Sequence, residues 1–119
     1  MTTNEIASRL AELCRQGKYE AAQKELYADD AVSIEPHPSS QFEKETKGLD
    51  AIIEKGHKWE ASVKESHSIT VSEPLVAGNA FAFILQMDLT MVEHGRINMT
   101  ELCVYRVKDG KIISEQFFM

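Results

Sequence analysis

The sequence has few of the features that mark secreted, membrane or nucleic-acid-binding proteins. Its 119 residues include two cysteines, too few for a disulfide framework. The 13 basic residues are outnumbered by 19 acidic ones, and nucleic acids and anionic membrane surfaces attract clusters of lysine and arginine instead. No run approaches the roughly 18 apolar residues of a membrane span. We therefore expect neither a nucleic-acid partner nor a membrane partner.

The first residues also lack the basic and apolar regions of a secretory signal. We expect a cytoplasmic protein in which Cys14 and Cys103 are buried as reduced thiols. What remains, 43% apolar and 27% charged residues, is typical of a globular chain. A chain of this length forms one core, so we expect residues 1–119 to make a single domain.

Apolar residues recur at helical spacing in three segments of the first half of the chain. The first segment begins with a capping box made by Thr2 and Glu5. The second covers residues 19–26, and the third follows Gly48. Because Gly56 interrupts the apolar face of the third segment, we expect it to mark a close approach of another backbone.

The hydrophobic period then changes to two, which indicates strands. A short strand from Ala31 ends at Pro36, and residues 36–47 are predicted to form a loop long enough for a lid or rim. An Asp109-Gly110 pair between the last two strands is typical of a hairpin turn. The later strands are expected over residues 68–72, 81–91, 96–107 and 111–118.

Alternation along the long strands assigns their side chains to two faces. The apolar face is expected to turn toward the helices and enclose a ligand cavity. The strand residues predicted to contact a ligand there are Phe83, Leu85, Met87, Cys103, Tyr105, Glu115 and Phe117. Trp59, on the third helical segment, is predicted to contact the same ligand. The opposite face carries Gln86, Asp88, Thr90, Asn98 and Thr100.

The order of these elements resembles a known superfamily. Two helices separated by glycine, the segment Tyr27-Ala28-Asp29-Asp30-Ala31 and a strand that ends in Glu35-Pro36 resemble the nuclear transport factor 2-like superfamily, in its SnoaL-like and ketosteroid-isomerase-like branch. The resemblance implies an α+β fold, a cystatin-like cone-shaped barrel with three N-terminal helices packed on a strongly curved, mostly antiparallel β-sheet. It also implies an internal cavity for a small apolar or carbonyl-containing molecule and a homodimer through the outer sheet face.

The resemblance also gives expectations for individual residues. The steroid isomerases of that branch remove a proton next to a ketone with a carboxylate that precedes proline, and Glu35 stands at that position. Their two oxyanion donors correspond here to Leu10 and Cys103, which donate nothing or only weakly. Losing one such donor costs around a hundred- to a thousandfold in rate, so steroid isomerase activity is not expected.

The candidate catalytic residues are Glu35, Glu101 and His37. Glu35 would be a general base whose pKa is raised by burial in the cavity. Strand parity directs Glu101 into the same space as Glu115, where mutual repulsion would keep one carboxyl group protonated. His37 lies between two prolines, as a possible proton-transfer group at the rim. The histidine spacing is not that of a metal site, and no metal or other cofactor is expected.

Two functions remain open at this point. One is a non-catalytic cavity protein that binds a small apolar molecule or serves as a dimeric module. The other is an isomerase-, cyclase- or dehydratase-type enzyme that uses Glu35 as a general acid or base next to a carbonyl group. The missing oxyanion donors favour the first, and the retained carboxylate favours the second. Convergence of Glu35 and Glu101 on one pocket is the observation expected to discriminate between them.

Overall fold

The computed structural model describes residues 1–39 and 42–119, which form three helices and one sheet. Residues 40 and 41 of the predicted loop lie outside the described residues. The helices are α1 (Thr3–Arg15), α2 (Tyr19–Leu26) and α3 (Leu49–Ser62). The strands are β1 (Tyr27–Ile34), β2 (Glu45–Lys47), β3 (Val63–Val71), β4 (Leu75–Ala77), β5 (Ala80–Met91), β6 (Gly95–Lys108) and β7 (Lys111–Phe118). The α+β fold class is as predicted.

Helix α1 begins and ends where local sequence signals place it. At the start of α1, the backbone N–H of Thr2 donates to Glu5 Oε1 at 2.8 Å, and the backbone N–H of Glu5 donates to Thr2 Oγ1 at 3.2 Å. Gly17 follows the helix with φ of 72°, a left-handed conformation that glycine adopts at low cost. No helix in the described part of the chain is both long and apolar enough to cross a membrane.

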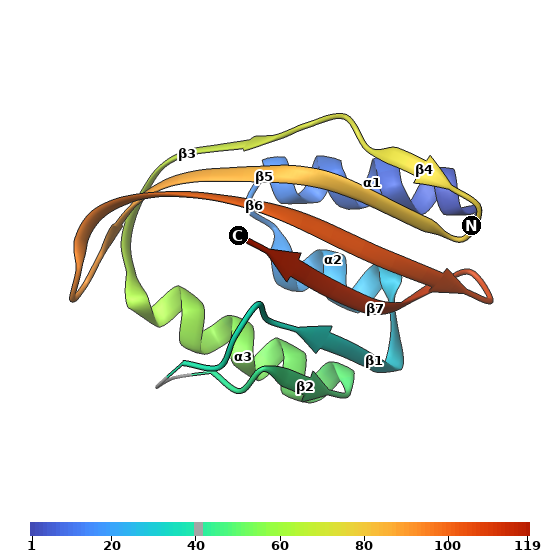
Figure 1. The fold of residues 1–119 in the computed structure, drawn as a ribbon, viewed down its shortest axis with the longest axis horizontal. Helices are drawn as coiled ribbons and strands as arrows, with labels where there is room; N and C mark the ends of the chain where they lie inside the picture. Colours follow the sequence, from blue (N-terminus) through green and yellow to red (C-terminus); the bar gives the residue numbers. More distant parts are fainter. Residues whose placement is uncertain (40–41) are drawn as a thin grey trace.

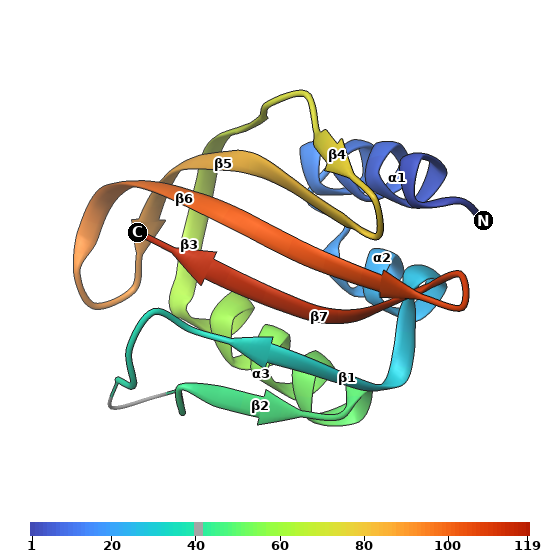
Figure 2. The same ribbon diagram turned by 45° about the vertical axis from the view of Figure 1, so that its right-hand side comes forward.

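The sheet has the order β2-β1-β7-β6-β5-β3, with β4 paired to β5. The β1–β7 pair is parallel, and every other pair in the described residues is antiparallel. α1, α2 and α3 lie along one face of this bent sheet, whose long strands β5 and β6 curve together (Figures 1 and 2). The curvature leaves a concave face under the helices, as the sequence predicted.

Two strand starts and two short additional strands differ from the sequence-based prediction. β1 starts at Tyr27 rather than at Ala31. This early start was not predicted because a bulge between Tyr27 and Val32 breaks the alternation of the strand. β2 lies inside the predicted loop, and β4 was not predicted, because three residues are too few to show a period. β3 starts at Val63 rather than at residue 68. Its first half was not predicted because it is exposed and polar and does not alternate.

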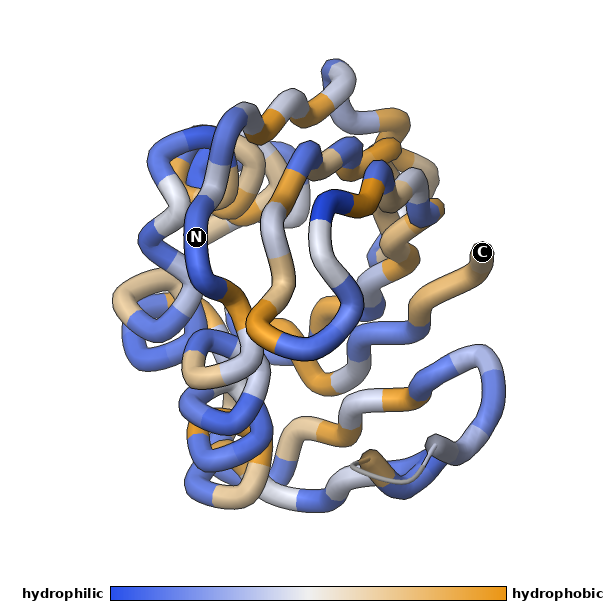
Figure 3. Tube along the Cα trace, turned by 90° about the vertical axis from the view of Figure 1, so that its left-hand side faces the viewer, coloured by the Kyte–Doolittle hydropathy of each residue, from blue (hydrophilic) through white to orange (hydrophobic). Residues whose placement is uncertain are grey.

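The inner face of the sheet is the predicted one. Phe83, Leu85, Met87 and Leu89 of β5 are all buried against the helices, whereas Gln86 is exposed on the other side. Figure 3 shows hydrophobic and hydrophilic residues following one another along the trace, in keeping with this alternation. The register of β5 is therefore fixed by its hydrophobic pattern.

A bulge near the last hairpin determines which residues of β7 point inward. Asp109 and Gly110 have φ of 52° and 76°, the two positive values of a type I′ turn. The register then shifts, so that Val107 pairs with Ile112 but Tyr105 pairs with Glu115. Ile112 and Glu115 are both buried as a result. This irregularity turns a carboxyl group into the interior of the protein.

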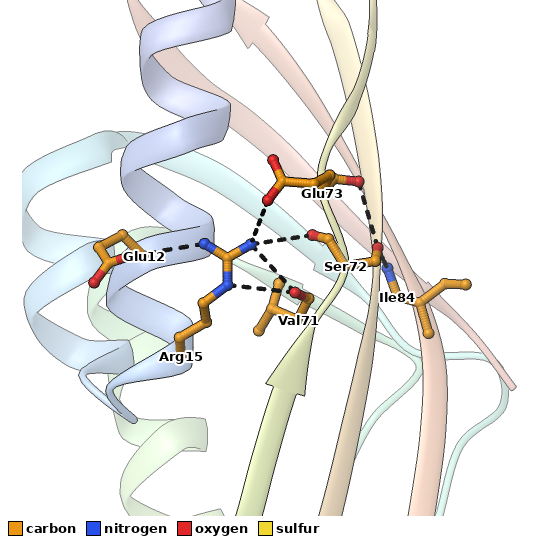
Figure 4. A network of polar contacts seen from close by, with 6 residues as sticks. All are labelled: Glu12, Arg15, Val71, Ser72, Glu73 and Ile84. Atoms are coloured by element: carbon orange, nitrogen blue, oxygen red, sulfur yellow. Dashed lines mark hydrogen bonds and ion pairs between the residues drawn. The ribbon is translucent and has the colours of Figure 1, made fainter.

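Arg15, in the last turn of α1, ties this helix to the edge of the sheet (Figure 4). Its Nε and Nη2 atoms donate to the carbonyl oxygen of Val71 at 3.3 and 3.2 Å, and Nη2 also donates to that of Ser72 at 3.5 Å. The Ser72 hydroxyl in turn accepts from the backbone N–H of Ile84 at 2.8 Å. These bonds fix the C-terminal end of α1 to the sheet, while the earlier turns of α1 cover the inner face of the sheet.

Candidate functional site

A cavity of about 370 Å³ lies between the helices and the inner face of the sheet. Most of the predicted ligand-contacting residues line it. These are Trp59 of α3, Leu85 and Met87 of β5, Tyr105 of β6, and Glu115 and Phe117 of β7. Phe83 and Cys103 are buried outside this lining, and the Phe83 ring packs 5.3 Å from that of Tyr105. These two residues support the wall of the cavity from behind.

All three candidate catalytic residues line this same cavity. Glu35 follows the end of β1, and Glu101 lies on β6, so topology joins two carboxyl groups that are far apart in the sequence. His37 is exposed, and with the exposed His57 of α3 it marks the mouth. Glu35 and Glu101 thus line one pocket, which is the observation named above as discriminating between the two functions.

Gly56 also faces the cavity, and here the prediction from the sequence was wrong. A β-carbon built at Gly56 meets no atom within 4 Å outside its own helix and chain neighbours, so no other backbone approaches it closely. Its lack of a side chain leaves open space at the lining.

A continuous set of polar contacts runs along the β1–β7 wall of the cavity. The hydroxyl of Tyr27 donates to Glu115 Oε1, and Ser33 Oγ donates to Glu115 Oε2 at 2.6 Å. Lys55 Nζ donates to Ser33 Oγ at 2.6 Å and to Glu35 Oε1 at 2.9 Å. Two carboxyl groups, one ammonium group and two hydroxyl groups are thus held by one another.

Sequence reasoning missed Tyr27, Ser33 and Lys55, although a signal existed for two of them. Ser33 has the same strand parity as Glu35, so it lies on the side that the family resemblance assigns to the cavity mouth. Lys55 lies three residues after the buried Ile52, which places both on one face of α3. A lysine on an apolar helix face indicates a buried acidic partner, because lysine is rarely buried unpaired.

The electrostatics of the cavity single out Glu101. Burial raises the pKa of Glu101 to about 7, and the negative charges of Glu35 and Glu115 add to this effect while Lys55 opposes it. Burial also raises the pKa of Glu115, against the hydrogen bonds from Ser33 and Tyr27. Lys55 forms an ion pair with the Glu35 carboxylate at 2.9 Å. Glu101 is therefore a buried carboxyl group that titrates near neutral pH.

The two cysteines are unsuited to nucleophilic chemistry. Burial raises the pKa of Cys14 to about 12 and moves the pKa of Cys103 upward as well. Cys103 Sγ lies 4.0 Å from Glu101 Oε1, at which distance a thiol is a weak donor. Within the described residues, no group of three or more His, Cys, Asp or Glu side chains is arranged to hold a metal ion.

Three helices packed on a bent sheet, around an apolar cavity that contains carboxyl groups, define an α+β protein with a cystatin-like fold. The sequence pattern of the SnoaL-like domain matches residues 1–119, and the chain belongs to this family.

Solved structures with the same fold agree with this assignment. A Mesorhizobium loti protein, provisionally named a SnoaL-like polyketide cyclase, is 34% identical, with a TM-score of 0.92 and 100% coverage of both chains. IdmH of Streptomyces antibioticus, provisionally named a polyketide cyclase, is 20% identical, with a TM-score of 0.74 and coverage of 99% of this chain and 91% of IdmH. A Catenulispora acidiphila protein with a ketosteroid isomerase-like fold is 17% identical, with a TM-score of 0.75 and coverage of 99% and 87%. The comparison with curated proteins gives no match.

Proposed function

We propose that the protein is an enzyme that moves a proton next to a carbonyl group of a small, largely apolar molecule. The observation that carries this proposal is the position of Glu101, whose pKa of about 7 belongs to a carboxyl group in the wall of an apolar cavity. A general acid or base is most effective when its pKa lies near the working pH. Glu101 has that property.

The cavity offers an acid and a base from two identical side chains. Glu101, when protonated, donates to the oxygen of a bound carbonyl group and withdraws electrons from the adjacent carbon. Glu35, at the position of the general base in the resembled isomerases, takes the proton from that carbon. Both side chains line one cavity, and the charge of Glu35 acts on Glu101. Different environments for paired carboxyl groups are a recurrent basis of acid–base catalysis.

The names of the structural relatives favour the same reaction class. The Mesorhizobium loti protein and IdmH are both provisionally named polyketide cyclases. Ring closure of a polyketide joins a nucleophilic carbon to a carbonyl carbon, and that nucleophile forms when a proton leaves the carbon next to a carbonyl group. Proton transfer is thus the step that a cyclase and an isomerase have in common.

A second candidate function is binding without catalysis. Leu10 lines the cavity at the position of an oxyanion donor in the resembled isomerases, and it has no hydrogen to donate. Lys55 also engages the carboxylate of Glu35. A protein that only stores or carries an apolar molecule needs neither an oxyanion donor nor an unpaired carboxylate.

Exchange of carbon-bound hydrogen distinguishes the two functions. Ketones and 1,3-dicarbonyl compounds would be incubated with the protein in D₂O, and loss of the proton next to the carbonyl group followed by NMR. We expect catalysed exchange that falls about a hundredfold or more in Glu101→Gln and in Glu35→Gln. Glu93→Gln, in an exposed turn, is the control. Binding of these compounds by the wild-type protein without exchange would establish the non-catalytic function.

We also propose a homodimer formed through the outer face of the sheet. Ile84, Leu102 and Phe118 pair across β5, β6 and β7, and all three are exposed, at 45%, 42% and 47%. The sequence predicted the polar residues of this face, such as Gln86 and Thr100, but not the apolar row beside them. Contiguous exposed apolar side chains on a sheet are typical of an interaction surface.

A further inference from the structure

Lys55 is the one lysine or arginine among the described residues that line the cavity. Its side chain is 14% exposed, on the face of α3 that also carries the buried Ile52 and the cavity residue Trp59. The ammonium group therefore lies at the surface of an apolar space rather than in bulk water, where its charge would be screened.

The ammonium group of Lys55 is held in place by two hydrogen bonds and has one N–H donor left. Nζ donates to Ser33 Oγ at 2.6 Å and to Glu35 Oε1 at 2.9 Å, and it lies 5.7 Å from the centre of the Phe117 ring. A lysine ammonium has three N–H donors, and the hydrogen bonds to described residues account for two. Phe117 lines the cavity too, so the third N–H is available to a molecule bound there.

We infer that Lys55 binds the carbonyl oxygen of the ligand and the negative charge that develops on this oxygen when a neighbouring proton is removed. This inference rests on the proposed function. In the proton-transfer step, a carboxylate takes the hydrogen from carbon, the electrons of that C–H bond form a carbon–carbon double bond, and the carbonyl electrons move to oxygen as an enolate. The enolate is stabilised by the Lys55 N–H donor, and return of the proton to carbon completes the cycle.

Lys55 would then be the oxyanion donor, a role for which Leu10 and Cys103 are unsuited. The positive charge makes the hydrogen bond strongest at the moment when the oxygen is most negative, which is the condition for catalysis rather than uniform binding. The ligand class that follows is a molecule with a ketone, 1,3-dicarbonyl or carboxylate oxygen at Lys55. Its apolar body would extend over Leu85 and Met87, which line the same cavity.

Besides protonated Glu101, Tyr19 is a further donor in the cavity, and the test must separate it from Lys55. Tyr19 lines the cavity, and its hydroxyl donates at 3.7 Å to Met87 Sδ, a weak acceptor that a carbonyl oxygen would readily displace. The negative groups that face the ammonium are Glu35, Glu101 and Glu115. A titration of binding must therefore be compared between variants at the same pH.

The experiment uses 4-nitrophenol, whose phenolate mimics an enolate and has a visible absorbance, and 4-nitroanisole, which has the same ring but no acidic hydrogen. We expect Lys55→Met to weaken phenolate binding about tenfold to a hundredfold, because a charge-assisted hydrogen bond is lost. Binding of 4-nitroanisole should change by less than about threefold. Lys58→Met, exposed on the same helix, should change neither affinity.

Two further variants distinguish loss of the donor from loss of the fold. Lys55→Met leaves Glu35 unpaired, so Lys55→Met/Glu35→Gln removes both charges, and Lys55→Arg restores the positive one. Phenolate affinity that is unchanged in both Met variants, or lost together with 4-nitroanisole affinity, would overturn the inference. Phenolate affinity lost in Tyr19→Phe but not in Lys55→Met would overturn it too, as would a wild-type protein that does not bind phenolate.

The phenolate experiment needs no turnover, so it is independent of the proposed function. Lys55-dependent binding without hydrogen exchange in D₂O would reject catalysis and keep Lys55 as the anchor of an anionic or carbonyl oxygen. Exchange that depends on Glu101 with Lys55-independent phenolate binding would keep catalysis and reject the role of Lys55.

Discussion

The hydroxyl group of Tyr27 donates a hydrogen bond to the carboxyl group of Glu115, which follows it by 88 residues. The parallel pairing of β1 with β7 brings the two together, and both are buried. A buried carboxyl group is costly unless donors replace the water that it loses. The contact therefore links the architecture of the sheet to the polar wall of the cavity.

Removing the Tyr27 hydroxyl should destabilise the protein more than removing that of Tyr19. In Tyr27→Phe the Glu115 carboxyl group loses a donor in the interior, and we expect a cost of about 1–3 kcal/mol in the free energy of unfolding. Tyr19→Phe loses only a bond to a sulfur atom, and its cost should be smaller. Urea unfolding of the three proteins measures the difference, and equal midpoints for the two variants would contradict the assigned role of Tyr27.

Glu101→Gln should stabilise the protein at high pH and not at low pH. The pKa of Glu101 is about 7 in the folded protein and near 4.5 when unperturbed, so folding favours the protonated form. Glu101 therefore has no effect below pH 4.5, and it lowers stability progressively as the pH rises through 7. At pH 8 the variant should be more stable by an amount on the order of 3 kcal/mol.

Thermal melts at pH 4 and pH 8 check this prediction, with Glu93→Gln in an exposed turn as the control. The wild-type and Glu101→Gln melting temperatures should agree at pH 4 and separate at pH 8. A variant that is less stable than the wild-type protein at pH 8 would identify Glu101 as a charged structural partner instead.

Arg15→Ala tests how α1 is held over the sheet. Arg15 donates to the carbonyl oxygens of Val71 and Ser72, so we expect its loss to cost about 1–2 kcal/mol of stability. Arg9→Ala is the matched control, because Arg9 forms an exposed ion pair with Glu25 on α2. Exposed pairs contribute less than about 1 kcal/mol, so chemical denaturation should rank Arg15→Ala as the more destabilising change.

The fold and the site differ in how far the sequence predicts them. The hydrophobic period of β5 gave its inner face, and the parity of Glu101 placed this carboxyl group in the cavity, because both depend on local alternation. The partner of Glu35 was missed, since its contact with Lys55 depends on the angle at which α3 crosses β1. The early start of β1 was missed because a bulge conceals its period. Local sequence patterns therefore predict the face of a strand on which a residue lies, whereas its side-chain partners depend on tertiary packing.

The proposed homodimer predicts that one charged residue on the outer face will separate the protomers. Leu102 is central in the apolar row, between Ile84 and Phe118. Leu102→Lys places like charges near a two-fold axis in an apolar interface, so we expect the mass measured by light scattering to halve. Lys64→Glu, exposed on the edge strand β3, is the control and should leave the dimer intact. A wild-type protein that is monomeric at micromolar concentration would refute the dimer itself.

Gly56 provides a test of the cavity that does not touch its polar groups. A β-carbon at this position meets no neighbour within 4 Å outside α3 and the adjacent residues, and glycine in a helix costs roughly 0.5–1 kcal/mol relative to alanine. Gly56→Ala should therefore raise the free energy of unfolding by about that amount.

Gly56→Leu should keep the fold and fill part of the cavity, because the longer side chain extends from a lining position into open space. We expect its melting temperature to stay at or above that of the wild-type protein while its affinity for 4-nitroanisole falls about tenfold or more, as steric exclusion predicts. Ala51→Leu, exposed on the same helix, controls for the added leucine and should bind 4-nitroanisole normally. If Gly56→Leu binds the compound as tightly as the wild-type protein does, the ligand lies elsewhere, because a side chain at Gly56 and a molecule in this cavity compete for the same space.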